Sequence, residues 1–128
     1  MSDEDQIRDL VAAWHRATAA GDIAKILGLM AEDVVFLRAG QAPMRGRAAF
    51  AEGTRAAIER FRIESSGDVQ EVCVSGNLAY CWTELRVNMI PRGGGEGSRR
   101  AGPALTILRK AGDGRWVVSR DANMLAEP

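Results

Sequence analysis

The sequence is poor in the residues from which most metal sites and nucleophilic sites are built. Its 128 residues contain one histidine, His15, and two cysteines, Cys73 and Cys81. One histidine cannot supply a His-rich metal site, and a Ser-His-Asp triad would have to use that same residue. A glycine-rich nucleotide-binding fingerprint is also missing. We therefore predict that the protein uses no metal and no cofactor.

Excess charge and long apolar segments are missing as well. The 17 Lys and Arg residues balance the 17 Asp and Glu residues, unlike the basic surface of a nucleic-acid-binding protein. No apolar run approaches the length of a membrane span. The first five residues are polar and acidic, unlike a signal peptide. We expect a cytoplasmic protein that binds neither nucleic acid nor membranes.

The two cysteines fall in neighbouring strand candidates. Without a secretion signal, buried thiols that act as small apolar side chains are more common than a disulfide. We predict that Cys73 and Cys81 are buried and free, with a disulfide between them as the alternative.

The first half of the chain carries helical patterns. Residues 3–20 have apolar side chains at helical spacing, behind a cap at Ser2 or Asp3, and Gly21-Asp22 ends this helix and starts a second one. The second helix is expected to end before a turn at residues 32–33. Its apolar side consists of Ile23, Ile26, Leu27 and Met30.

Strand patterns dominate the rest of the chain, apart from one further helix. We predict a strand at 34–37, a loop at 38–46, a helix at 47–61, and strands at 62–75, 78–90, 104–110 and 115–125, with a bend or bulge at 65–68. The glycine-rich residues 91–98 are expected to form a mobile hairpin loop. This order predicts a single α+β domain, residues 1–128. Its three N-terminal helices should pack in the concave face of a curved, mainly antiparallel sheet, which forms an α+β cone or barrel with an internal pocket.

Several short motifs are spread over nearly the whole chain. They are Ile7-Arg-x-Leu-Val-x-x-Trp14, Ala17, Gly21-Asp22, Leu29-Met-Ala-x-Asp-Val-Val-Phe36, Gly46-Arg47, Thr106-x-Leu-Arg109 and Gly114-Arg-Trp116. Together they resemble the nuclear transport factor 2-like superfamily, also called SnoaL-like or cystatin-like, and in particular its branch from antibiotic gene clusters. Because these residues maintain the fold, the resemblance implies the α+β barrel and says little about the activity.

The resemblance also implies where a site would lie. Polar residues on the last strand line the pockets of superfamily members, and some members use a carboxylate to remove a proton beside a carbonyl. In the isomerases that base follows the first strand, and a tyrosine on the first helix donates a hydrogen bond. Here Arg38 and Trp14 stand at these places, which argues against isomerase chemistry. A cyclase-type base at Asp121 remains.

Asp121 and Asn123 alternate on the last strand and are the predicted catalytic residues. If their face points inward, Asp121 can act as a base and Asn123 can donate to an oxyanion. In the alternative, Trp116, Val118 and Ala122 point inward instead, and Asp121 pairs with Arg109 or Arg120 at the surface. We predict that His15 lies at the surface or rim, because one histidine without a partner is weak evidence for acid–base chemistry.

Four apolar residues from different elements are predicted to form the wall of the pocket, and the loop Gly93–Gly97 is predicted to cover its mouth. The wall residues are Trp14, Phe36, Met44 and Phe50.

The long strand at 78–90 has two different faces. One face is apolar and is predicted to face the helices, while the other carries Tyr80, Trp82, Glu84 and Arg86. Superfamily members commonly dimerise through the outer face of the sheet. We therefore predict a homodimer with Tyr80 and Trp82 near its two-fold axis and an ion pair between Glu84 and Arg86 across it.

Two functions are compatible with these features. The first is a small-molecule pocket protein with cyclase- or isomerase-type acid–base chemistry on an apolar carbonyl compound. The alternative is a non-catalytic ligand-binding or structural homodimer.

Overall fold

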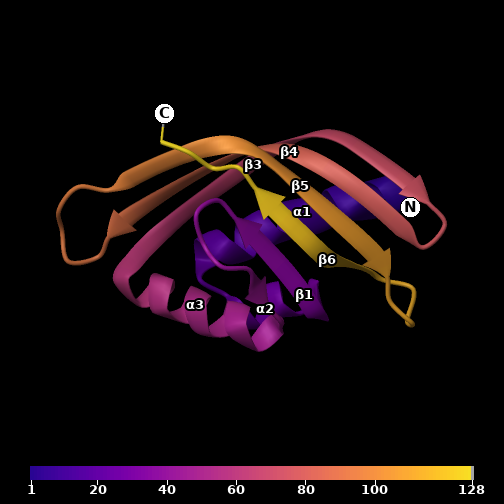
Figure 1. The fold of residues 1–128 in the computed structure, drawn as a ribbon, viewed down its shortest axis with the longest axis horizontal. Coiled ribbons are helices and arrows are strands. Elements are labelled where there is room, and N and C mark those ends of the chain that lie inside the picture. The colour runs from indigo at the N-terminus through magenta and orange to yellow at the C-terminus, as the bar shows by residue number, and fades with distance from the viewer. Residues whose placement is uncertain (128) are drawn as a thin grey trace.

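The computed structural model describes residues 1–127, which form three helices on one side of a six-stranded sheet. The strand order is β2-β1-β6-β5-β4-β3; β1 and β6 are parallel and the other neighbours are antiparallel. Figure 1 shows the sheet arching over the helices. The predicted α+β fold is confirmed. The elements are α1 (Asp3–Ala20), α2 (Ile23–Leu27), β1 (Met30–Arg38), β2 (Met44–Arg45), α3 (Arg47–Arg60), β3 (Phe61–Ser75), β4 (Leu78–Pro91), β5 (Ser98–Lys110) and β6 (Trp116–Asn123).

Helix α1 forms where its capping residues predict. The Ser2 hydroxyl accepts a hydrogen bond from the Asp5 amide at 3.1 Å. Three acidic residues occupy the first turn, where their negative charges interact favourably with the positive end of the helix dipole. At the other end Gly21 adopts φ 70°, which glycine tolerates best. Ile7 and Leu10 on the inner side of α1 are buried. The helix therefore packs firmly along the concave face of the sheet.

The start of β1 differs from the prediction. Met30 is not the last apolar residue of α2 but the first residue of β1, and residues 32–33 lie within this strand. Met30 pairs with Val118 of β6, and the register then shifts before Val35. Pairing with a strand almost ninety residues away decided the structure of this segment, so the predicted turn is an exposed irregularity in β1 instead.

The hairpin of β4 and β5 is also longer than predicted. Strand β5 begins at Ser98, because residues 98–103 pair with β4, and this leaves only a short glycine-rich connection. The irregularity in β3 lies beside Gln70, where the register shifts, and not at residues 65–68.

The core lies between α1, α2 and the sheet, and it leaves α3 at its margin. Ile7, Ile26 and Leu108 are fully buried, whereas α3 has no buried residue. Helix α3 contacts β1, β2 and β3, and one of its sides lines an open space in front of the concave face of the sheet. In residues 1–127 none of the helices combines the length and apolarity needed to cross a membrane.

Candidate active site

A cavity of about 390 Å³ lies between α1, α3 and the concave face of the sheet. This volume lies within the range of pockets that bind small molecules. Trp14, Phe36 and Phe50 form an aromatic cluster on its wall, with ring centroids 4.8–6.1 Å apart. Met44 lies beside them, so all four predicted wall residues line the cavity. None of the lining residues comes from the loop Gly93–Gly97, whereas Leu125 near the C-terminus contributes.

Asp121 faces this cavity because β6 contains a bulge. Val118 pairs with Leu108 and Arg120 pairs with Ile107, which leaves Ser119 as an extra residue in β6. An extra residue moves all later side chains to the opposite face of the sheet. The second alternative therefore holds only before the bulge, where Trp116 and Val118 belong to the core, and it is wrong for Ala122, which lies on the outer face. Val118 faces the helices before the bulge, and Asp121 and Asn123 face the cavity after it.

The surroundings of Asp121 favour its protonated form more than water does. Burial raises the pKa of this carboxyl group to about 6, although a hydrogen bond from Thr106 acts in the opposite direction. The Thr106 hydroxyl donates to Oδ1 at 2.6 Å and fixes the orientation of the carboxylate. The side chain keeps some accessible surface because the cavity opens in front of it. A carboxylate of this kind can take up and release a proton near neutral pH.

The surface ion pairs of Asp121 that formed the alternative are not present among the described residues. Arg109 pairs with Asp33 at 2.9 Å, and Arg120 donates to the backbone carbonyls of Asp33 and Ser119. Both arginines thus have other partners.

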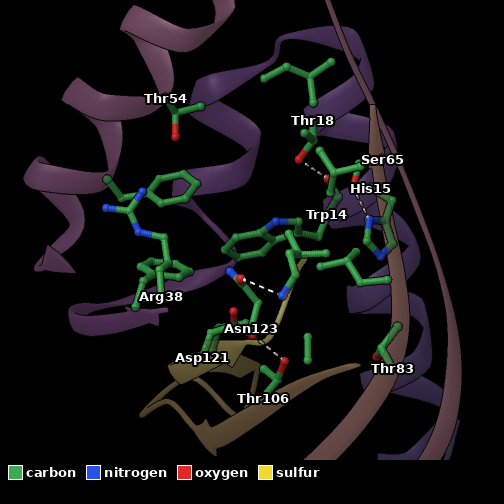
Figure 2. A pocket seen from close by; sticks show the side chains of 18 of the residues that line it. Trp14, His15, Thr18, Arg38, Thr54, Ser65, Thr83, Thr106, Asp121 and Asn123 are labelled. Carbon is green, nitrogen blue, oxygen red and sulfur yellow. Dashed lines mark hydrogen bonds between the residues drawn. The ribbon is translucent and has the colours of Figure 1, made fainter. Parts of the chain in front are cut away.

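Asn123 lies two residues beyond Asp121 and also lines the cavity. Its Oδ1 accepts a long hydrogen bond of 3.5 Å from the amide of Leu125. This contact orients the side chain so that its amide nitrogen can donate to a molecule in the cavity. Figure 2 shows Asp121, Asn123 and Thr106 together at one end of the cavity.

His15 is placed differently from the prediction. It lies half-buried in the cavity wall, with its Nδ1 2.8 Å from the Ser65 hydroxyl. Desolvation by burial, together with the charge of Arg86, lowers the pKa of His15, so the imidazole is neutral at neutral pH. Helix α1 crosses β3 closely at this point, because a Cβ on Gly67 would lie only 2.9 Å from His15 Nε2. No local sequence pattern predicts the contact between His15 and Ser65, because these residues are 50 positions apart.

The four predicted interface residues lie on the other face of the sheet. The alternate residues of β4, including Thr83, Leu85 and Val87, line the cavity. On the outer face the Tyr80 hydroxyl donates to the Glu71 carboxylate, which raises the pKa of Tyr80 to about 12. Trp82 is half-buried and Glu84 is exposed. Arg86 pairs with Asp68 of the same chain at 3.2 Å.

Both cysteines are free, and only one of them is buried. Cys81 faces the core, where burial raises its pKa to about 11. Cys73 is exposed because it pairs with Tyr80 on the outer face, so the prediction of two buried thiols was wrong for this residue. Within the described part of the chain, no three His, Cys, Asp or Glu residues are grouped so that they could hold a metal ion.

Comparison with known proteins adds the family context. The family described as "SnoaL-like domain" matches residues 11–119, while no curated protein matches the chain. A conserved protein from Planctomyces limnophilus is 34% identical, with a TM-score of 0.94 and 98% of each chain covered. A ketosteroid isomerase-like protein from Erwinia carotovora atroseptica is 21% identical, with a TM-score of 0.86 and 100% of each chain covered. A nuclear transport factor 2-like superfamily protein from Salmonella enterica is 15% identical, with a TM-score of 0.83 and 98% of this chain and 90% of that chain covered. At these identities the last two similarities concern the fold alone.

Proposed function

The chain belongs to the SnoaL-like domain family, and from its cavity we propose that it is an enzyme that moves a proton on an apolar carbonyl compound. The observation that carries this proposal is Asp121, a carboxyl group of raised pKa at the end of an aromatic-walled cavity. Desolvated carboxyl groups in clefts are frequent general bases. Thr106 holds one carboxylate oxygen and leaves the other to face the substrate.

In the proposed reaction the free oxygen of Asp121 removes a proton from the carbon next to the carbonyl. The electron pair of the C–H bond moves into the C–C bond, and the carbonyl oxygen becomes an enolate oxygen. The Asn123 amide donates a hydrogen bond to that oxygen, which stabilises the negative charge where it develops. Protonated Asp121 then returns the proton to the same carbon or to a conjugated one, so the cycle needs no cofactor.

A test that needs no knowledge of the natural substrate is hydrogen exchange of a simple ketone. The cavity is large enough for 2-tetralone, a bicyclic ketone whose α-hydrogens exchange slowly with deuterated water. We expect the protein to accelerate this exchange above the buffer rate, as measured by proton NMR. Exchange at the buffer rate for a ketone that demonstrably binds would contradict the proposed chemistry.

The exchange rate should depend on pH in a direction that the pKa of Asp121 sets. A general base works in its deprotonated form, so the rate constant should rise about tenfold per pH unit in acid and level off above the pKa, which is about 6. The measurement is the same NMR assay at several pH values, corrected for the buffer rate at each. A profile that is already level at pH 4.5 would mean that a carboxyl group of ordinary pKa, or another group, controls the rate.

The alternative function is non-catalytic binding. A cavity walled by Trp14, Phe36 and Phe50 can hold an apolar ligand without any reaction. Tight binding of 2-tetralone without accelerated exchange would favour this alternative.

We also propose that the protein is a homodimer that associates through the outer face of its sheet. A row of apolar residues crosses four strands there, since Trp82 pairs with Leu105, Leu105 with Ala122, and Ala122 with Leu37. Leu105 is 41% and Leu37 is 45% exposed. Contiguous exposed apolar residues of this kind favour association.

A charge in the middle of this row should separate the subunits. We expect the wild type to be a dimer at micromolar concentration and Leu105→Glu to be a monomer, as measured by sedimentation velocity. In a dimer the new carboxylate would be buried in the interface without a partner. Ala56→Glu places the same charge on an exposed position of α3 and should leave the dimer intact. A wild-type monomer, or a dimer that withstands Leu105→Glu, would contradict this assembly.

Placement in the antibiotic-cluster branch and a cytoplasmic location remain predictions.

A further inference from the structure

We propose that the natural ligand of the cavity carries a carboxylate and that Arg38 binds it. This inference rests on the proposed function, since it specifies which carbonyl compounds the same cavity accepts. It follows from the position of Arg38, from its lack of a partner, and from the surroundings of its guanidinium group.

Arg38 is the last residue of β1 and one of the cavity-lining residues. It pairs with Asn123 of β6 in the sheet, one step along the same face from the pair of Phe36 and Asp121. Figure 2 shows its side chain extending away from Asp121, on the side of the cavity where Thr54 of α3 lies. His15 lies on the opposite side of Trp14 in the same view.

Within residues 1–127 the guanidinium group of Arg38, which lines the cavity, has neither a carboxylate partner nor a side-chain hydrogen bond. Arg86 and Arg109 each pair with a carboxylate, and Arg47 donates to the carbonyl of Met30 at 2.9 Å. Within residues 1–127, no carboxylate oxygen lies within 4.0 Å of the Arg38 guanidinium. Its Nε is buried and forms no hydrogen bond, as is also true of the Nε of Arg47, but Arg47 keeps an acceptor for its Nη2. A buried donor without an acceptor is costly, and arginine cannot avoid this cost by losing its charge.

Asp121 does not serve as the missing partner. Its Oδ1 accepts the hydrogen bond from Thr106, and none of the ion pairs among the described residues joins it to Arg38. The pKa of Asp121 is set by burial and by Thr106, with no lowering by a neighbouring arginine. The cavity therefore holds a base and a separate, unneutralised cation, which is an arrangement for a ligand with two functional groups.

The chemistry of the site indicates what that second group is. A guanidinium binds a carboxylate through two parallel hydrogen bonds, and one positive charge matches one negative charge. A phosphate monoester would place nearly two negative charges near Asp121, with only Arg38 to compensate them. The remaining walls are largely aromatic and aliphatic. The ligand class is thus an amphipathic organic acid, in which an apolar body carries one carboxylate and the reacting carbonyl.

The test compares two probes of equal size and different charge. We expect 2-naphthoate to bind at least about tenfold more tightly than neutral 2-naphthamide in isothermal titration calorimetry at pH 7.5, because only the carboxylate forms a charge-assisted pair. Arg38→Gln should abolish this preference and leave 2-naphthamide binding within about twofold. Arg45→Gln removes an exposed arginine that follows the wall residue Met44 but does not line the cavity, and this control should keep the preference.

Each outcome separates this inference from the proposed function. Equal affinity of the two probes for the wild type, or a preference that survives Arg38→Gln, would overturn the carboxylate site and leave the chemistry of Asp121 untouched. Failure of both probes and of 2-tetralone to bind would overturn the ligand-binding cavity itself. The melting temperature of unliganded Arg38→Gln gives a second readout. A binding role predicts an unchanged or higher value, because an unsatisfied buried donor is removed, whereas a clear decrease would indicate a structural role.

Discussion

Replacing Asp121 by asparagine should lower the rate of ketone α-hydrogen exchange by roughly 100- to 10,000-fold, the usual contribution of a general base. Asparagine has nearly the same shape and can still accept the hydrogen bond from Thr106, but it cannot take up a proton. The binding of 2-tetralone should change little, so the effect should appear in the rate of the bound complex. The measurement is the NMR exchange assay at saturating ketone.

The same substitution should make the protein more stable at neutral pH. The pKa of Asp121 is about 6 in the folded protein against an ordinary value of 3.8. For an acid whose pKa is raised by folding, the stabilisation is present below the ordinary value and is lost as the pH rises through the folded value. Two pKa units correspond to about 3 kcal/mol at pH 7, and asparagine avoids most of this cost. Chemical denaturation at pH 4 and pH 7 should therefore show a gain for Asp121→Asn only at pH 7.

Asp113→Asn is the matched control for both measurements. Asp113 lies in an exposed turn, where Arg115 holds its pKa below the ordinary value, and it does not line the cavity. Its replacement should leave exchange unchanged and should not stabilise the protein. If Asp121→Asn exchanged at the wild-type rate, another group would be the base, and Asp121 would be only a polar residue of the cavity wall.

A valine at Gly67 should disturb the contact between α1 and the sheet. A Cβ at this position would lie 2.6 Å from Thr83 Cγ2 and 2.9 Å from His15 Nε2, closer than packed atoms tolerate. We expect a loss of roughly 1–3 kcal/mol in the free energy of unfolding and weaker binding of 2-tetralone, because α1 carries Trp14 and His15 into the cavity wall.

Gly112→Val is the control, since nothing lies within 4 Å of a Cβ at this turn and its φ is not positive. Its stability should stay within about 0.5 kcal/mol of the wild type. The measurement is the melting temperature of Gly67→Val and of Gly112→Val, each compared with that of the wild type. Equal melting temperatures for Gly67→Val and the wild type would show that α1 and β3 can separate at little cost, and that the wall around His15 is not rigid.

The sequence predicted those parts of the fold that local patterns determine. The apolar spacing and capping residues of α1 defined its bounds, and the two faces of β4 were assigned correctly because apolar and polar residues alternate along it. The start of β1 was missed, since the segment at Met30 is paired by β6 and not by its own neighbours in the chain. Long-range pairing of this kind leaves no local periodicity to read.

The candidate site depended on two features that no local pattern shows. The bulge at Ser119 brings Asp121 to the cavity face, and it arises from how β6 pairs with β5. The position of His15 depends on how closely α1 crosses β3. The sequence marks Arg38 only as the residue at the place of an isomerase base, which does not predict a ligand-binding role. That the buried Nε of Arg38 has no acceptor depends on the positions of side chains from other elements, which no local pattern predicts.

The pKa of Asp121 is the measurement that tests its assignment as the base most directly. A carbon-13 NMR titration can follow its side-chain carboxyl carbon in the unliganded protein, with the Asp121→Asn variant used to assign the signal. We predict a pKa of about 6, because the walls of the cavity desolvate the carboxylate. A pKa near the ordinary value of 3.8 would contradict this assignment, because such a carboxylate would be solvated and a poor proton carrier at neutral pH.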